Sequence, residues 1–206
     1  MIIKNFTSGP LGTNSYLVTD KNTKKSFIVD AGGHNVDMVN HIKENQLQVE
    51  YIILTHGHGD HIGGVEAYKK EFPGVKLVAG AEEKQLLSDA KLNFSRETTG
   101  FSIGLVADHY VIDGETIKVG DMELKFIHTP GHTKGGICIL VKDALFSGDT
   151  LFAQSIGRTD FPGGSYPEIV ASIRNKLFVL PDDTRVYPGH MNETTIGREK
   201  ETNPFV

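Results

Sequence analysis

The stretch from Thr55 to His61 constrains this chain more than any other part of the sequence. It reads Thr-His-Gly-His-Gly-Asp-His, with three histidines and one aspartate in six residues, directly after the apolar run 51–54. That run predicts a buried strand, and loops at strand ends commonly carry function because a rigid element positions them. Imidazole nitrogens and carboxylate oxygens together suit zinc, iron or manganese. The stretch therefore predicts a metal site at the end of a strand.

The spacing within this stretch favours two metal ions over one. A tetrahedral site needs about four ligands. His56 and His58 lie two positions apart, so in an extended segment they project from the same side and can converge on one ion. Asp60 and His61 follow at once and can serve a second ion. The alternative is a surface loop that is merely rich in histidine.

Ligand-type residues recur at other predicted strand ends, which argues against that alternative. Each follows an apolar run, and together they are His132 in Pro-Gly-His, Asp149 in Ser-Gly-Asp and His190 in Pro-Gly-His. Asp30 also ends a predicted strand, as Thr55 does. We expect Asp30 and Thr55 to lie near the site, with Asp30 orienting a histidine ligand through a hydrogen bond. The alternative for Asp30 is a turn residue that caps the following helix.

Length, charge and cysteine usage bound the class of protein. The 206 residues suffice for one domain with a sizeable core, so we predict a single domain over residues 1–206. A net charge of −5 argues against non-specific binding of nucleic acid. No segment has the length of a membrane span, and the N-terminus does not resemble a signal peptide. The single cysteine, Cys138, predicts a packed core thiol in a reducing, cytoplasmic setting.

The order of predicted elements is strand-rich, helical, strand-rich and helical again. This order predicts an α/β fold of two similar halves, whose sheets pack face to face with helices outside. Residues 92–105 predict a loop or an irregular helix over the site. Strands at 111–112 and 116–119 flank a predicted turn, and residues 166–180 predict an amphipathic helix. Three further charged residues are expected to form a solvated face: Arg198, Glu199 and Lys200.

The four ligand-bearing motifs resemble those of the metallo-β-lactamase superfamily over nearly the whole chain. The resemblance implies an αββα sandwich of two mixed sheets, with the site at the edge of both. It implies that one divalent ion is held by His56, His58 and His132, and a second by Asp60, His61 and His190. Asp149 matches the carboxylate that bridges the two ions. Zinc is the expected metal, with iron or manganese as alternatives.

Within the superfamily, the chain is most similar to glyoxalase II, the hydroxyacylglutathione hydrolases. The strings 129–133, 146–152 and 203–205 carry this likeness. It implies hydrolysis of a small acyl thioester such as S-lactoylglutathione, with Asp60 and Asp149 as catalytic residues. The β-lactamases of the fold lack the bridging aspartate, so Asp149 argues against antibiotic hydrolysis. Arg158 either binds a substrate carboxylate or pins its own loop, and Asp160 stands where glyoxalase II has a tyrosine.

Two other functions are compatible with these residues. Persulfide dioxygenases share the fold and a very similar string at residues 157–161, and they use one iron, which here would be held by His58, His132 and Asp149. A metal-binding module without catalysis is the further alternative. Neither nucleic acid nor a membrane is an expected partner, and the oligomeric state stays open.

Overall fold

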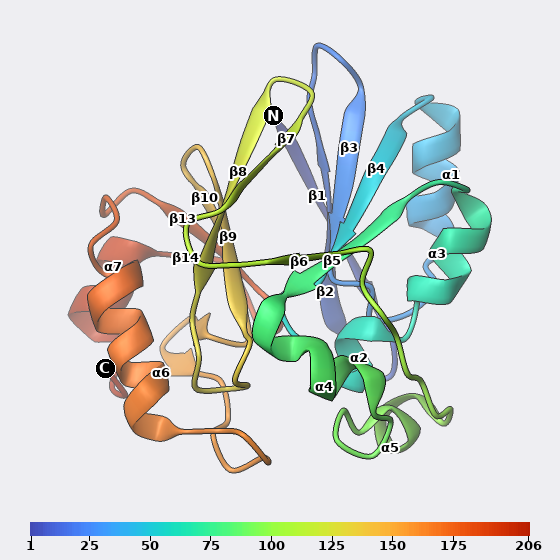
Figure 1. Cartoon of the computed structure of the whole chain (residues 1–206). Helices are drawn as coiled ribbons and strands as arrows, with labels where there is room; N and C mark the ends of the chain where they lie inside the picture. Colours follow the sequence, from blue (N-terminus) through green and yellow to red (C-terminus); the bar gives the residue numbers. More distant parts are fainter.

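Two β-sheets lie face to face in the computed structural model, which describes residues 1–206, and helices cover both outer faces (Figure 1). The first sheet has six strands in consecutive order. They are β1 (Ile2–Ser8), β2 (Thr13–Thr19), β3 (Lys25–Val29), β4 (Gln48–Ile53), β5 (Lys76–Gly80) and β6 (His109–Val111). The first three strands are antiparallel, and β3 to β6 are parallel. The parallel connections carry helices: α1 (Val36–Glu44), α2 (Gly59–Ile62), α3 (Val65–Glu71), η1 (Ala81–Glu83), α4 (Lys84–Ser88) and α5 (Ser95–Thr99).

The second sheet also has six strands, in the order β14-β13-β10-β9-β8-β7. They are β7 (Thr116–Val119), β8 (Met122–His128), β9 (Ile137–Val141), β10 (Ala144–Gly148), β13 (Arg185–Pro188) and β14 (Thr194–Thr195). Only β10 and β13 run parallel. The remaining elements are the hairpin β11 (Leu151–Phe152) and β12 (Ser155–Ile156), and the helices α6 (Tyr166–Ser172), η2 (Ile173–Leu177) and α7 (Ile196–Thr202). Both sheets are therefore mixed, as the sequence predicts.

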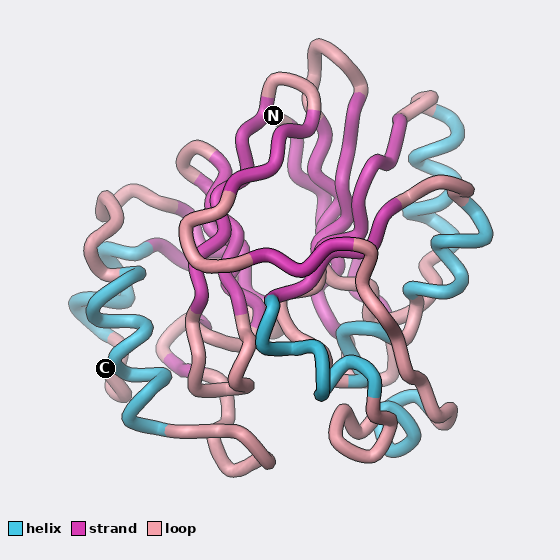
Figure 2. The backbone as a smooth tube through the Cα atoms, viewed as in Figure 1, coloured by secondary structure: helices cyan, strands magenta, loops and turns pink.

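Three hydrophobic cores hold the layers together, and strand alternation distributes side chains among them. Phe27 and Val29 of β3 face the space between the sheets, whereas Ile28 faces the helices on the outer side. In β10, Phe146 joins the inner core and Leu145 packs toward α6. This is the two-residue period of a strand buried on both faces. Figure 2 shows the two groups of strands with helices outside each, which confirms the αββα sandwich.

Three details of the sequence-based prediction differ from the structure. The strands near residues 111 and 116 belong to different sheets, because β6 pairs with β5 and β7 pairs with β8. The long helix predicted over 166–180 ends at Leu177. Glu199 is buried rather than solvated, since its carboxylate accepts hydrogen bonds from Gln154 N and Thr194 Oγ1. Cys138 is a fully buried core thiol, as predicted. None of the helices has the length and apolar character needed to cross a membrane.

Candidate metal centre

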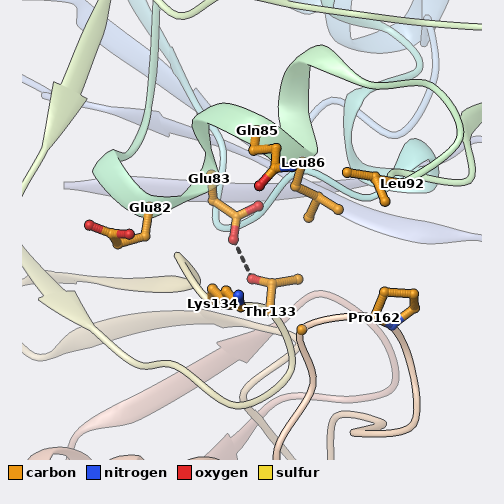
Figure 3. A pocket seen from close by; sticks show the side chains of 9 residues that line it. Glu82, Glu83, Gln85, Leu86, Leu92, Thr133, Lys134 and Pro162 are labelled. Carbon is orange, nitrogen blue, oxygen red and sulfur yellow. Dashed lines mark hydrogen bonds between the residues drawn. The ribbon is translucent and has the colours of Figure 1, made fainter.

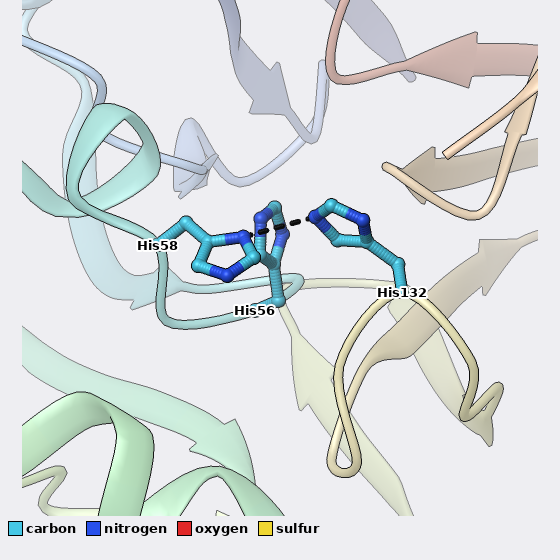
Figure 4. Close-up of side chains that lie close together, drawn as sticks. All are labelled: His56, His58 and His132. Atoms are coloured by element: carbon cyan, nitrogen blue, oxygen red, sulfur yellow. Dashed lines mark hydrogen bonds between the residues drawn. The ribbon is translucent and has the colours of Figure 1, made fainter. Parts of the chain in front are cut away.

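The seven ligand-type side chains predicted from the sequence converge where strands of both sheets end. Their ligand atoms form three overlapping groups, each within 4.8 Å: His56, His58 and His132; His56, His61 and Asp149; and Asp60, His61 and His190. Figure 4 shows the first group, with two rings from the loop after β4 turned toward the ring of His132 from the loop after β8. The structure thus brings together all seven residues, and it leaves His41 and His109 elsewhere on the first sheet and its helices.

The distances divide the cluster into two sides with one carboxylate between them. On one side, His58 Nδ1 lies 2.9 Å from His132 Nε2. On the other, His190 Nε2 lies 3.3 Å from His61 Nε2 and 3.1 Å from Asp60 Oδ2. Asp149 reaches both sides, because its Oδ2 lies 3.6 Å from His132 Nε2 and its Oδ1 lies 3.4 Å from His61 Nε2. A carboxylate in this position can be shared by two cations.

Unpartnered buried polar atoms show that the donor set fits a cation. His56 Nε2 and Asp149 Oδ1 are buried and have no hydrogen-bond partner, although buried polar atoms in proteins are nearly always paired. Two ring nitrogens that approach within 2.9 Å also present their lone pairs to the same small space. Imidazole nitrogens with carboxylate oxygens are the donors that zinc, iron and manganese accept. The residues present therefore fit one cation on each side of Asp149.

The electrostatics keep donors on the first side in the form that binds metal. Burial lowers the pKa of His58 to about 3, with a further contribution from nearby His132. Burial also holds the pKa of His56 well below its usual value. For Asp149, burial raises the pKa, but His61 and other histidines outweigh it and keep the carboxylate ionised. Neutral imidazoles and an ionised carboxylate are what a divalent ion requires.

Asp30 and Thr55 lie directly behind the cluster. Asp30 Oδ2 lies 2.9 Å from His61 Nδ1 and accepts a hydrogen bond from Thr55 Oγ1 at 2.8 Å. With its Nδ1 on Asp30, His61 directs Nε2 toward Asp60 and Asp149. A carboxylate on the far ring nitrogen fixes the tautomer and the ring orientation. The helix after Asp30 is capped instead by Asn35, whose side chain accepts from Met38 N.

Close packing around the second side explains the glycine that precedes His190. A Cβ added at Gly189 would lie 2.4 Å from Asp149 Oδ1 and 2.6 Å from His61 Cε1. Real Cβ atoms essentially never make contacts this short. The Pro-Gly-His motif therefore has a steric reason: only glycine lets the backbone pass this close to two ligand-type side chains.

Two polar residues that support the cluster are missed by sequence reasoning. Glu83 is buried at the end of η1 and accepts hydrogen bonds from Gly57 N and Gly135 N, both at 2.9 Å, and from Thr133 Oγ1. Figure 3 shows the carboxylate reaching across to Thr133. Asn14 donates to two backbone oxygens on either side of His190, those of Pro188 and Met191. Nothing in the local sequence separates Glu83 from its exposed neighbour Glu82.

A cleft of about 390 Å³ opens onto the cluster. Arg158 lies at this cleft, and its side chain is exposed and engaged by its own loop. Its Nη2 and Nε donate to Asp160 at 2.7 and 3.0 Å, and the guanidinium lies 4.3 Å from the centre of the Phe161 ring. Its backbone oxygen lies 2.7 Å from His132 Nδ1. Arg158 thus both pins its loop and borders the cleft.

Comparison with known proteins agrees with this geometry. The sequence model of the metallo-β-lactamase superfamily matches residues 8–190. The hydroxyacylglutathione hydrolase GloC of Haemophilus influenzae is 36% identical over 201 residues, which cover 94% of this chain and 92% of GloC. Among solved structures, the BLEG-1 B3 metallo-β-lactamase superposes with a TM-score of 0.91 at 38% identity, covering 99% of both chains. ETHE1 from Myxococcus xanthus has a TM-score of 0.83 at 30% identity, covering 99% of this chain and 84% of the other. On this evidence the chain belongs to the metallo-β-lactamase superfamily.

Proposed function

We propose that this chain is a dinuclear metal-dependent hydrolase of acyl thioesters, similar to glyoxalase II. The observation that carries the proposal is the position of Asp149 between two groups of donors. His56, His58 and His132 would hold one ion, and Asp60, His61 and His190 the other. When bound, two divalent ions activate water for attack on an acyl carbon and polarise its carbonyl oxygen. Zinc is the first choice, with iron and manganese as alternatives.

The residues of the chain then have separate roles around the acyl group. Asp60 lines the cleft and lies 3.1 Å from His190 Nε2, so its carboxylate can orient the attacking water and accept its proton. Asp149 also lines the cleft and lies between the two donor groups. The pKa of a thiol is about 8.5, so the thiolate of the carrier can leave the acyl carbon without a dedicated general acid. Hydrolysis of a thioester therefore needs no further acid in the cleft.

Two other activities have support from particular likenesses. The string at residues 157–161, which is very similar to that of persulfide dioxygenases, favours such an enzyme with one iron on His58, His132 and Asp149. The BLEG-1 lactamase, at 38% identity, favours β-lactam hydrolysis and weighs against the expectation that Asp149 excludes it. The complete second group of Asp60, His61 and His190 is the reason to rank a dinuclear hydrolase above the mononuclear enzyme. GloC supports a thioester over a β-lactam.

The test pairs metal content with three assays on one freshly purified sample. The assays measure S-lactoylglutathione hydrolysis, oxygen uptake with glutathione persulfide, and hydrolysis of a chromogenic cephalosporin. Close to two ions per chain with thioester turnover is the expected result. One iron with oxygen uptake and no hydrolysis would replace the hydrolase by the dioxygenase. Cephalosporin turnover without thioester turnover would assign the site to β-lactams. A metal-loaded chain that turns over neither these three substrates nor other acyl thioesters would contradict the proposal and leave a metal-binding module.

A further inference from the structure

The cleft over the cluster has an apolar, largely aromatic wall. Six of its lining residues are hydrophobic: Leu11, Phe94, Phe152, Ile156, Phe161 and Met191. The aromatic rings stand close to ligand-type histidines, with Phe161 5.3 Å from the His58 ring and Phe152 6.3 Å from the His190 ring. Phe94 and Phe161 also contact one another, at 5.2 Å between ring centres. A molecule bound in the cleft beside the cluster can therefore contact aromatic surfaces.

The backbone holds Phe94 in place at some conformational cost. Its φ of +55° lies in the left-handed region, which a bulky side chain rarely adopts and which often marks a functional site. The fully buried Asn93 fixes this turn, because its side chain accepts from Ser95 N and donates to Ile103 O. Asn93 O accepts from Gly59 N at 2.7 Å, which ties the turn to the loop of His58 and Asp60. Phe94 is thus positioned relative to the cluster itself.

The charges of the cleft do not suit an anionic carrier. Arg158 is the one arginine or lysine among the lining residues, and two of its nitrogens already bind Asp160. The two carboxylates that line the cleft, Asp60 and Asp149, would be engaged by the cations of the proposed function. Glutathione carries two carboxylates and one ammonium group. Apart from the metal centre, the cleft therefore offers the carboxylates of glutathione a single cationic side chain, and that guanidinium is already paired with Asp160.

We infer that the cleft selects thioesters whose acyl group is apolar and whose thiol carrier is uncharged, in preference to hydroxyacyl thioesters of glutathione. This inference rests on the proposed thioesterase function. An aryl acyl group would lie against Phe94 and Phe161, which gain contact that a lactoyl group is too small to provide. Offset or edge-to-face contact between aromatic rings contributes binding free energy beyond that of burying their area.

The test measures kcat/KM for four thioesters on the metal-loaded chain. Lactoyl and phenylacetyl groups are each attached to glutathione and to N-acetylcysteamine, and every rate is divided by the rate of hydroxide-catalysed hydrolysis of the same compound. Phenylacetyl esters should exceed lactoyl esters by about tenfold, the lower range for added apolar contact in a pocket. N-acetylcysteamine esters should equal or exceed glutathione esters.

Variants of the aromatic wall show whether it causes the preference. Phe161→Ala and the milder Phe161→Leu should lower the phenylacetyl-to-lactoyl ratio about five- to tenfold, the effect of one aromatic contact. Phe101→Ala is the matched control, because Phe101 belongs to the same segment as Phe94 but is 75% exposed and lies outside the cleft. A tenfold preference for S-lactoylglutathione would overturn this inference and leave the thioesterase intact. Absence of turnover with all four esters would overturn the thioesterase itself.

Discussion

At the scale of single residues, Glu83 links two of the loops that carry ligand-type histidines. One carboxylate oxygen binds Gly57 N, between His56 and His58, and the other binds the backbone of Gly135 and the hydroxyl of Thr133. Burial raises the pKa of Glu83, and these three donors oppose that effect. Because its partners belong to both halves of the sandwich, Glu83 ties the loop of His58 to the loop of His132.

Removing this carboxylate should loosen the first donor group. We expect Glu83→Ala to leave three buried donors unpaired, to lower the free energy of unfolding by about 3 kcal/mol, and to reduce bound metal. Glu83→Gln keeps one carbonyl acceptor, so its stability and metal content should lie between those of the unaltered chain and of Glu83→Ala. Urea unfolding and metal analysis after dialysis measure both effects. Glu82→Ala, at the exposed neighbouring position, is the control, and equal metal content in Glu83→Ala would refute the role.

Cys138 illustrates a residue whose burial decides its chemistry. Burial raises the pKa of its thiol to about 11, and the sulfur lies 3.4 Å from Thr129 Oγ1 within the third core. We expect a disulfide reagent to modify no thiol in the folded chain and one thiol in urea, because reaction needs an exposed thiolate. Cys138→Ala should leave metal content unchanged. Rapid modification of the folded protein would show that this core opens.

At the scale of elements, β2 of the first sheet holds the loop that follows β13 of the second. Asn14 N donates to Gly189 O at 2.8 Å, and the Asn14 side chain binds the carbonyls of Pro188 and Met191. Tyr16 OH adds a bond to Pro188 O at 2.8 Å. His190 therefore depends for its position on a strand that contributes no ligand.

Asn14→Ala should weaken the second donor group selectively. Two carbonyls lose a partner, so the segment around His190 can move, and one ion per chain should exchange with a chelator faster than the other. A coloured chelator that reports zinc release with time measures this. Asn22→Ala is the matched control. The Asn22 side chain also donates a hydrogen bond from one half of the sandwich to the other, to Asp121, but it lies away from the ligand-type residues. Uniform release of both ions from Asn14→Ala would contradict the assignment.

These elements also show why sequence predicts one part of the site and misses another. His56 to His61 form a compact motif, and His132, Asp149 and His190 each follow an apolar strand, so local pattern suffices to find them. Glu83 bonds to residues 26 and 52 positions away, and Asn14 to one 174 positions away. Such partners are set by how the loops pack. The same holds for β6 and β7, whose short apolar patterns do not reveal which sheet each one joins.

At the scale of the whole molecule, the cluster joins the two halves of the sandwich. His56, His58, Asp60 and His61 follow β4 of the first sheet, whereas His132, Asp149 and His190 follow strands of the second. Backbone contacts span the same junction, as when Ile137 N donates to Thr55 O at 2.9 Å. A bound ion would therefore hold one sheet to the other, and the unfolded chain would not retain this arrangement of donors.

Metal removal should for this reason lower the melting temperature. Binding to the folded state alone stabilises it by about 2.7 kcal/mol per site when free metal is 100 times Kd. At this size about 1 kcal/mol shifts Tm by roughly 2–4 °C, so the chelated chain should melt at least about 5 °C lower. Differential scanning calorimetry at increasing zinc measures the shift. Asp149→Ala should lose most of this dependence together with activity, while His109→Ala, whose exposed ring pairs with Glu115, should retain it. A Tm independent of zinc would mean that the two halves are held by packing alone.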